Sequence, residues 1–323
     1  MHRRKGLKWL FAAVVLFFLV LAARQFDPQS LLDSLRQIPL WAVLLLFGLQ
    51  LVTQLLINWQ WHSIARSFAS PLTFHEMLYI NAQAEIIHIA PAGHIGCDVF
   101  RAVQINRAGN VSGEQAASVV AIQKLFSLSA FFTVSLLSIG FFIGQVEWLY
   151  GVLLVILLLM GCVFIMPHKM AAFLTKRWKK KARFAWVNRL RTFVMASLAQ
   201  VVLLRKTPLL FAKLLIIALC IWILYPLKLY LLAVQLMPDS NVLHISAATF
   251  LSYTVAMIPI FPGGLGGFEA TMMGLLLFMG FAQGGALVIT VLFRFATFWF
   301  VVLVSFVYMG VYRVCCNRGS KSK

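Results

Sequence analysis

Two basic residues, Lys124 and Arg294, stand near the middle of long runs of apolar residues. A cationic side chain at that depth in a membrane is costly unless it faces the inside of the protein and finds an anionic partner. The chain offers Asp98 and Glu269 as partners in structural ion pairs. A lipid phosphate is the other candidate partner. The two interpretations are compatible, because an ion pair that opens could admit a phosphate.

Glu85 and His88 are three positions apart, so on a helix they would share one face. Di-iron helical bundles use the same spacing for metal ligands. This chain has only one copy of the pair, because the corresponding positions of its second half hold Ala256 and Pro259. We therefore expect no metal ion and no cofactor. A proton relay and a polar cavity lining stay open as roles for the pair.

His94 lies in a predicted turn, where it could titrate near neutral pH or act as a simple hydrogen-bonding group. Arg101 follows in the same polar stretch. We expect the residues that bind a lipid headgroup or serve transport to be Arg294, Lys124, Glu269, Asp98, Arg101, Glu85, His88 and His94. We expect no catalytic residue, so the protein is predicted not to be an enzyme.

A motif that breaks helices occurs twice, as "PAGHIGCDV" from Pro91 and as "PGGLGGFEA" from Pro262. Proline removes a backbone donor and disfavours helix in the residue before it, and glycine permits a tight reversal. Each copy therefore predicts a helix, a turn and a second helix. The predicted turns contain Pro91, Gly93, Gly96, Pro262, Gly263, Gly264, Gly266 and Gly267.

The predicted helices around these turns have recognisable ends. Thr73 and Glu76 have the spacing of a capping box and predict the start of the first helix. That helix should end near Ala90, and the next should begin near Cys97. In the second copy we expect one helix to end at Phe261 and another to begin near Phe268.

The composition places these residues in a membrane protein. Of 323 residues, 62% are hydrophobic and only 11% are charged, and the mean hydropathy is +0.90. The net charge of +19 comes from basic residues in loops and tails, where they set topology and meet anionic lipid headgroups rather than nucleic acid. The longest polar insert, residues 167–207, is too short for a catalytic domain and is expected to be a basic cytoplasmic loop.

Apolar runs long enough to cross a bilayer are residues 7–23, 40–58, 114–142, 149–166, 208–234 and 285–311. The segments 73–106 and 244–281 are interrupted by the motif. We predict an all-α polytopic membrane protein with about six full transmembrane helices plus two re-entrant helical hairpins. The distribution of basic residues places both termini in the cytoplasm. Lys213 and Lys228 lie near opposite ends of one span and are expected to extend their ammonium groups towards the membrane surfaces.

The two motif copies are 171 positions apart. The same offset pairs Asp98 with Glu269 and four glycines with four glycines, which predicts an internal duplication. The halves are residues 1–145 and 146–313, and a basic tail, 314–323, follows within one membrane domain, 1–323. Each half has an odd number of full crossings, so the halves should face opposite ways, as in many transporters.

The motif "PGGLGGFEA", together with "GHIGCDVFR" upstream, resembles the lysylphosphatidylglycerol synthase transmembrane-region family over roughly residues 7–312. The resemblance implies binding or movement of lipids with charged headgroups in a bacterial or archaeal cytoplasmic (inner) membrane. No aminoacyl-transferase domain is present, so lipid lysylation does not follow. Many members carry an acid–arginine pair where this chain reads "AIQKLFS", with one cation and no acid.

These observations favour a flippase-like lipid translocase for an anionic or polyprenyl-phosphate-linked lipid, bound between two opposed hairpin tips. An intramembrane enzyme acting on lipid phosphates and a non-catalytic subunit of an envelope lipid or glycan assembly are the alternatives. The expected partners are membrane phospholipids or lipid-linked intermediates, with no nucleic acid. The oligomeric state, the lipid, the direction of movement and the energy source stay open.

Overall fold

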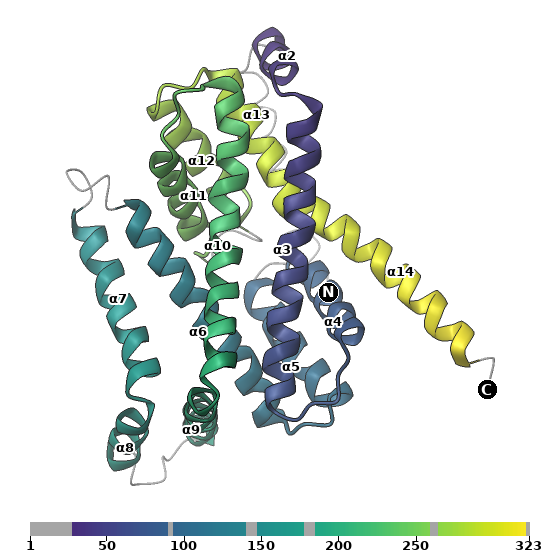
Figure 1. Ribbon diagram of the computed structural model, residues 1–323, viewed down its shortest axis with the longest axis vertical. Helices are drawn as coiled ribbons and strands as arrows, with labels where there is room; N and C mark the ends of the chain where they lie inside the picture. Colours follow the sequence, from purple (N-terminus) through teal and green to yellow (C-terminus); the bar gives the residue numbers. More distant parts are fainter. Residues whose placement is uncertain (1–27, 90–92, 140–146, 178–184, 259–263, 321–323) are drawn as a thin grey trace, which may run out of the picture.

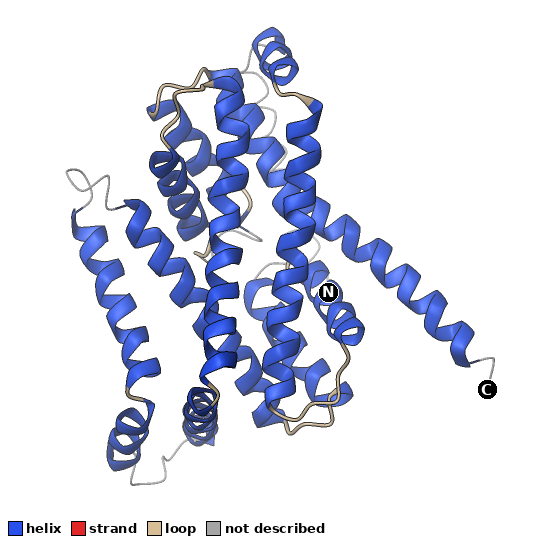
Figure 2. Cartoon of the chain, viewed as in Figure 1, coloured by secondary structure: helices blue, strands red, loops and turns tan. Residues whose placement is uncertain are grey.

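The computed structural model describes residues 28–89, 93–139, 147–177, 185–258 and 264–320. Within these ranges every regular element is a helix (Figure 2). The expectation of an all-α protein is therefore confirmed for the part of the chain that the structure describes. The predicted first span, residues 7–23, lies outside the described residues.

The helices form two similar series joined by a connecting segment. The first series is α2 (Pro28–Gln37), α3 (Leu40–Ser67), α4 (Phe74–Ile87), α5 (Gly93–Ala108) and α6 (Gly113–Ile139). The connecting helices are α7 (Glu147–Ile165), α8 (Pro167–Arg177) and α9 (Ala185–Lys206). The second series is α10 (Pro208–Leu236), α11 (Val242–Ala256), α12 (Gly267–Phe278), α13 (Gln283–Arg294), the π-helical turn η3 (Phe295–Trp299) and α14 (Phe300–Ser320).

Four of the described helical segments are long and apolar enough to cross a membrane: α3, α6, α10 and the continuous stretch Gln283–Cys315. A fifth span results if Tyr150–Ile165 is joined to Pro167–Lys176, although the two are bent by 93°. Each of these five segments coincides with a predicted span. The protein is thus a multi-pass helical membrane protein by length and composition.

Residues 167–207, predicted as a basic cytoplasmic loop, contain helices α8 and α9. Leu198, Val201 and Leu204 of α9 are buried, so an apolar stripe at helical spacing packs this helix onto the bundle. The side chain of Gln200 also donates a hydrogen bond to the carbonyl of Ser67 at 3.2 Å. The sequence analysis, which considered the high density of basic residues, did not foresee helical structure within this segment.

The first copy of the motif separates α4 from α5. The capping box is confirmed, since the Thr73 hydroxyl accepts from the Glu76 N–H and the Glu76 carboxylate accepts from the Thr73 N–H. The helix ends at Ile87, three residues before the expected Ala90, and Pro91 lies outside the described residues. The next helix begins at Gly93 rather than near Cys97, so Gly96 is helical and Asp98 lies beyond the first turn.

The second copy separates α11 from α12. The first of these helices ends at Ala256, five residues before the expected Phe261, while α12 begins at Gly267 close to the expected position. Gly264 and Gly266 have φ of +72° and +86°, a left-handed conformation that glycine adopts without the steric cost of a side chain. Pro262 and Gly263 lie outside the described residues. This break therefore requires glycine, whereas Gly96 in the first copy has helical geometry.

We predict that Gly264→Ala lowers the free energy of unfolding by about 2 kcal/mol, because alanine at positive φ is strained. The added Cβ would also lie 2.8 Å from the Cβ of Ala256. Gly266→Ala should cost less, since its Cβ would meet no atom within 4 Å. Gly274→Ala, in the open on α12, is the matched control and should stabilise slightly. Unfolding in mixed micelles would measure all three, and equal values for Gly264→Ala and Gly274→Ala would contradict the prediction.

Two hydrophobic cores hold the bundle together. One core joins α10 to α13 with the first half of α3, and the other joins α3 to α6 with α9 and the first half of α10. In Figure 1, α11–α13 gather at the upper end and α4 and α5 at the lower end, while α3 and α10 run along both. The order of a long helix, a broken helical pair and another long helix thus occurs twice, and it leaves a space between the two cores.

Candidate functional site

A cavity of about 420 Å³ lies between the two halves. Its lining comes from helices α3 to α6 of the first series and from α10, α11, α13, η3 and α14 of the second. Six of the eight predicted site residues line it: Glu85, His88, Asp98, Arg101, Lys124 and Arg294. The cavity is therefore built from both repeats of the helical order, and charged side chains approach it from each.

Arg101 is the centre of a buried polar network on α5. Its guanidinium donates to Glu85 Oε1 at 2.8 Å, to Asp98 Oδ1 at 3.2 Å and to Asn81 Oδ1 at 3.0 Å. The amide of Asn81 in turn donates to Asn58 Oδ1 on α3 at 2.8 Å. The Arg101 side chain is only 7% exposed, so these contacts replace water around its charge.

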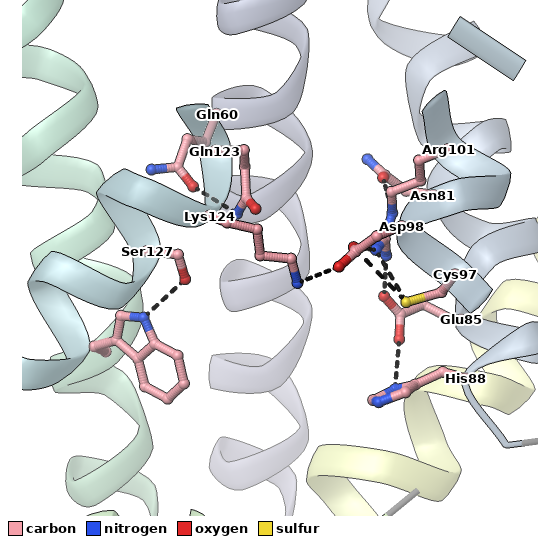
Figure 3. A network of polar contacts seen from close by, with 11 residues as sticks. Gln60, Asn81, Glu85, His88, Cys97, Asp98, Arg101, Gln123, Lys124 and Ser127 are labelled. Carbon is pink, nitrogen blue, oxygen red and sulfur yellow. Dashed lines mark hydrogen bonds and ion pairs between the residues drawn. The ribbon is translucent and has the colours of Figure 1, made fainter. Parts of the chain in front are cut away.

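Lys124 extends this network across the cavity. Its Nζ reaches from α6 to Asp98 Oδ2 on α5 at 3.0 Å, so one carboxylate serves both Lys124 and Arg101 (Figure 3). The Lys124 side chain is 42% exposed, far more than that of Arg101. Lys124 is consequently the cation that can change partner with the smallest rearrangement of the protein.

His88 and Glu85 lie side by side, with Nδ1 and Oε2 3.8 Å apart. The imidazole also contacts the ring of Phe298 on η3, from the other half of the chain. Within the part of the chain that the structure describes, no three or more His, Cys, Asp or Glu side chains are grouped to hold a metal ion. His94 lies in the first turn of α5, and its side chain lies outside the described residues.

Arg294 forms a second charged centre where α13 passes into η3. Its Nε lies 2.9 Å from Glu269 Oε1, and its guanidinium lies between the rings of Phe268 and Phe298, at 4.9 and 4.5 Å from their centroids. The other carboxylate oxygen of Glu269 accepts from the Gly266 N–H at 2.7 Å. The motif acid therefore neutralises the arginine and caps α12 at once.

The predicted counter-ions are thus confirmed, one for each mid-span cation. Asp98 of the first motif copy pairs with Lys124, and Glu269 of the second copy pairs with Arg294. The acid from the motif and the cation from the following long helix meet in both halves. Together with the Glu85–Arg101 pair, the cavity region contains three cations and three acids.

Neutral polar residues that the sequence analysis did not single out complete the lining. Gln123 donates to Gln60 Oε1 at 3.2 Å, and the Trp222 indole donates to the Ser127 hydroxyl at 3.1 Å. Polar residues inside apolar spans were the signal that could have revealed them, because such side chains turn away from lipid.

The expectation for Lys228 was wrong. It does not extend to a membrane surface but is 0% exposed, with its ammonium against α3. It donates to the side chains of Gln50 and Thr53 and lies 4.1 Å from the centroid of the Tyr225 ring. Among the described residues, no carboxylate lies within ion-pairing distance of it. Gln50 and Thr53, three positions apart in an apolar helix, were the available signal.

We predict that Lys228→Met leaves the free energy of unfolding unchanged or raises it by about 1 kcal/mol, because it removes a buried charge held by neutral groups only. Gln50→Leu should instead destabilise by about 2 kcal/mol, since it takes a hydrogen-bond acceptor from the ammonium. Unfolding in mixed micelles compares the two variants. A loss of more than about 2 kcal/mol in Lys228→Met would show that its contacts hold α3 and α10 together.

Comparisons with known proteins agree with this architecture. The sequence model of the family described as "Lysylphosphatidylglycerol synthase TM region" matches residues 7–305. The chain is also similar to a protein named "UPF0104 membrane protein" from Methanothermobacter thermautotrophicus, with 22% identity over 293 residues. That similarity covers 85% of this chain and 86% of the relative.

Proposed function

Because the chain belongs to the lysylphosphatidylglycerol synthase TM region family, we propose that it is a membrane lipid translocase that binds an anionic or polyprenyl-phosphate-linked headgroup. The observation that carries this proposal is the cavity between the two halves, which Arg101, Lys124 and Arg294 line. The protein performs no covalent chemistry in this proposal. Its substrate is a membrane phospholipid or a lipid-linked intermediate.

Exchange of ion-pair partners is the proposed binding step. The three cations are balanced by three acids, so a phosphate does not enter an empty positive site but takes the place of a carboxylate. Lys124 is the first contact, because its side chain is 42% exposed and Asp98 keeps Arg101 as a partner when Lys124 leaves. The low dielectric of the cavity strengthens each new contact relative to water.

An inverted repeat is the proposed basis of movement across the membrane. The halves follow the same helical order. When the sequence is aligned with itself at an offset of 171 positions, Leu40, the first residue of α3, aligns with Phe211 in the first turn of α10. In this arrangement α4–α5 and α11–α12 are hairpins that enter from opposite faces. Both termini and helices α8 and α9 lie on the cytoplasmic side of an inner membrane.

Reconstitution tests the proposal. Purified protein in liposomes should move fluorescent anionic phospholipid between leaflets, and Lys124→Gln should slow this movement about tenfold, as expected for the loss of one charge-assisted contact. Lys213→Gln is the matched control, since Lys213 is an exposed lysine of α10 that does not line the cavity. Headgroup turnover would instead support an enzyme. No movement and no turnover would support a non-catalytic subunit.

A further inference from the structure

A second cavity, of about 280 Å³, lies between α3, α4 and α14. Its lining is mainly aliphatic, as at Leu55, Leu78 and Val304, and includes a few polar side chains such as Gln54, Ser305 and Tyr308. We call this second cavity the side groove. It adjoins the cavity described above, and among the described residues no ion pair crosses it.

The side groove is continuous with the cavity of about 420 Å³ described above, which we call the charged cavity. Gln54, Ile57, Glu85 and Val301 line both. Glu85 stands at the junction, where it is held by Arg101 at 2.8 Å. One end of the groove therefore meets the charged network at Glu85, while most of the remaining lining is aliphatic. Such a gradient from charged to aliphatic lining matches a molecule with a phosphate at one end and a hydrocarbon tail at the other.

The other end of the side groove reaches the outside of the bundle. Leu51 and Leu55, one helical turn apart on α3, line the groove and are 42% and 51% exposed. Since α3 is long and apolar enough to cross a membrane, we expect these exposed leucines to face the acyl chains of the bilayer. The groove thus extends from exposed leucines of α3 to the residues that it shares with the charged cavity.

Contacts between α4 and α14 hold two sides of the side groove together. The Tyr308 hydroxyl donates to the His75 carbonyl at 3.2 Å, the rings of Tyr79 and Tyr312 stack at 4.6 Å, and Arg313 donates to the Tyr79 hydroxyl at 3.1 Å. The groove is too small for a protein segment, because one turn of helix about 10 Å wide occupies about 420 Å³. A single extended hydrocarbon chain is the occupant that fits its volume and its mainly aliphatic lining.

From these observations we propose that the side groove holds one acyl or prenyl chain of the same lipid whose phosphate occupies the charged cavity. This inference rests on the proposed function and names its substrate class: an intact lipid that enters sideways from the bilayer, not a free phosphate or a soluble phosphoester. A chain gains little hydrophobic free energy on leaving lipid for an apolar groove. The role of the groove is therefore to position the headgroup rather than to supply affinity.

Photocrosslinking tests the inference directly. Wild-type protein in liposomes would be irradiated with phosphatidylglycerol that carries a diazirine in one acyl chain, and the adducts mapped by mass spectrometry. We expect adducts on Leu78, Val304 and their neighbours in the side groove. Adducts confined to the outer surface of the spans would overturn the inference. This arm needs no substitution, so it does not depend on whether a variant folds.

Two variants then ask whether the chain in the groove belongs to the lipid in the charged cavity. Val304→Phe fills the groove from α14, and Leu78→Phe fills it from α4. Each substitution should reduce groove adducts and lipid movement about tenfold. Val307→Phe is the matched control: Val307 lies on the outer face of α14 and is 67% exposed, so this variant should change neither quantity. Lys124→Gln should also reduce groove adducts if the two ends belong to one molecule, whereas the chain of a bulk lipid would be unaffected.

The outcomes separate this inference from the proposed function. Binding of soluble glycerol 3-phosphate should be the same in Val304→Phe, Leu78→Phe and wild type, because the charged cavity is intact. If wild type moves lipid and both filled variants move it equally well, the inference is wrong and the proposed function stands. If wild type neither binds nor moves any lipid, the proposed function fails first. If wild type binds glycerol 3-phosphate but does not move lipid, the result would support a free phosphate as the ligand and overturn the inference.

Discussion

Arg101→Gln should lower the free energy of unfolding by about 4 kcal/mol, the largest stability loss that we expect from a single substitution in this protein. The guanidinium is the shared partner of Glu85, Asp98 and Asn81, and its side chain is 7% exposed. Removing it leaves two carboxylates close together without their common cation. Among the residues that the structure describes, Lys124 and His88 remain within 4 Å of these carboxylates, and neither can replace the planar fork of an arginine.

Arg107→Gln is the matched control for this prediction, because Arg107 lies on the same helix, in its last turn, and is exposed. It should change the free energy of unfolding by less than about 0.5 kcal/mol. Arg101→Lys should fall between the two, since an ammonium keeps the charge but loses the bidentate contact. Unfolding in mixed micelles would measure all three. Equal stability of Arg101→Gln and Arg107→Gln would show that the network contributes nothing to the fold.

Arg294→Gln should reduce lipid movement about 100-fold while the protein still folds and inserts, if Arg294 captures the lipid phosphate. The loss of two charge-assisted hydrogen bonds to phosphate is worth about 3 kcal/mol. The fold should tolerate the change, because Glu269 keeps its hydrogen bond from the Gly266 N–H and is 29% exposed. Arg294→Lys should recover movement only in part. The liposome assay measures the rates, with Lys213→Gln as control.

A double substitution separates phosphate capture from simple neutralisation of charge. Glu269→Gln alone should destabilise the protein, since it takes the carboxylate from a guanidinium that is 8% exposed. Arg294→Gln with Glu269→Gln should restore stability, because removing both charges costs less than leaving one. We expect this double variant to be stable and inactive. A stable and active double variant would refute phosphate capture by Arg294.

Features that depend on neighbours along the chain could be predicted from the sequence. The capping box of Thr73 and Glu76, the start of α12 beside Phe268 and the positions of the long apolar helices follow from short-range spacing and from the length of a membrane crossing. The sequence also indicated which charged residues would line the cavity. Charged side chains in apolar spans must avoid lipid, which is why Lys124 and Arg294 could be expected to face the inside of the bundle, where both line the cavity.

The tertiary structure decided which partners meet. The composition allowed either motif acid to pair with either mid-span cation, and the packing of α5 on α6 and of α12 beside α13 joined Asp98 to Lys124 and Glu269 to Arg294. The burial of Lys228 against Gln50 likewise depends on how α10 is rotated about its axis relative to α3. Hydrophobicity places a helix in the membrane, but that rotation is set by side-chain packing between helices distant in sequence, which no local pattern contains.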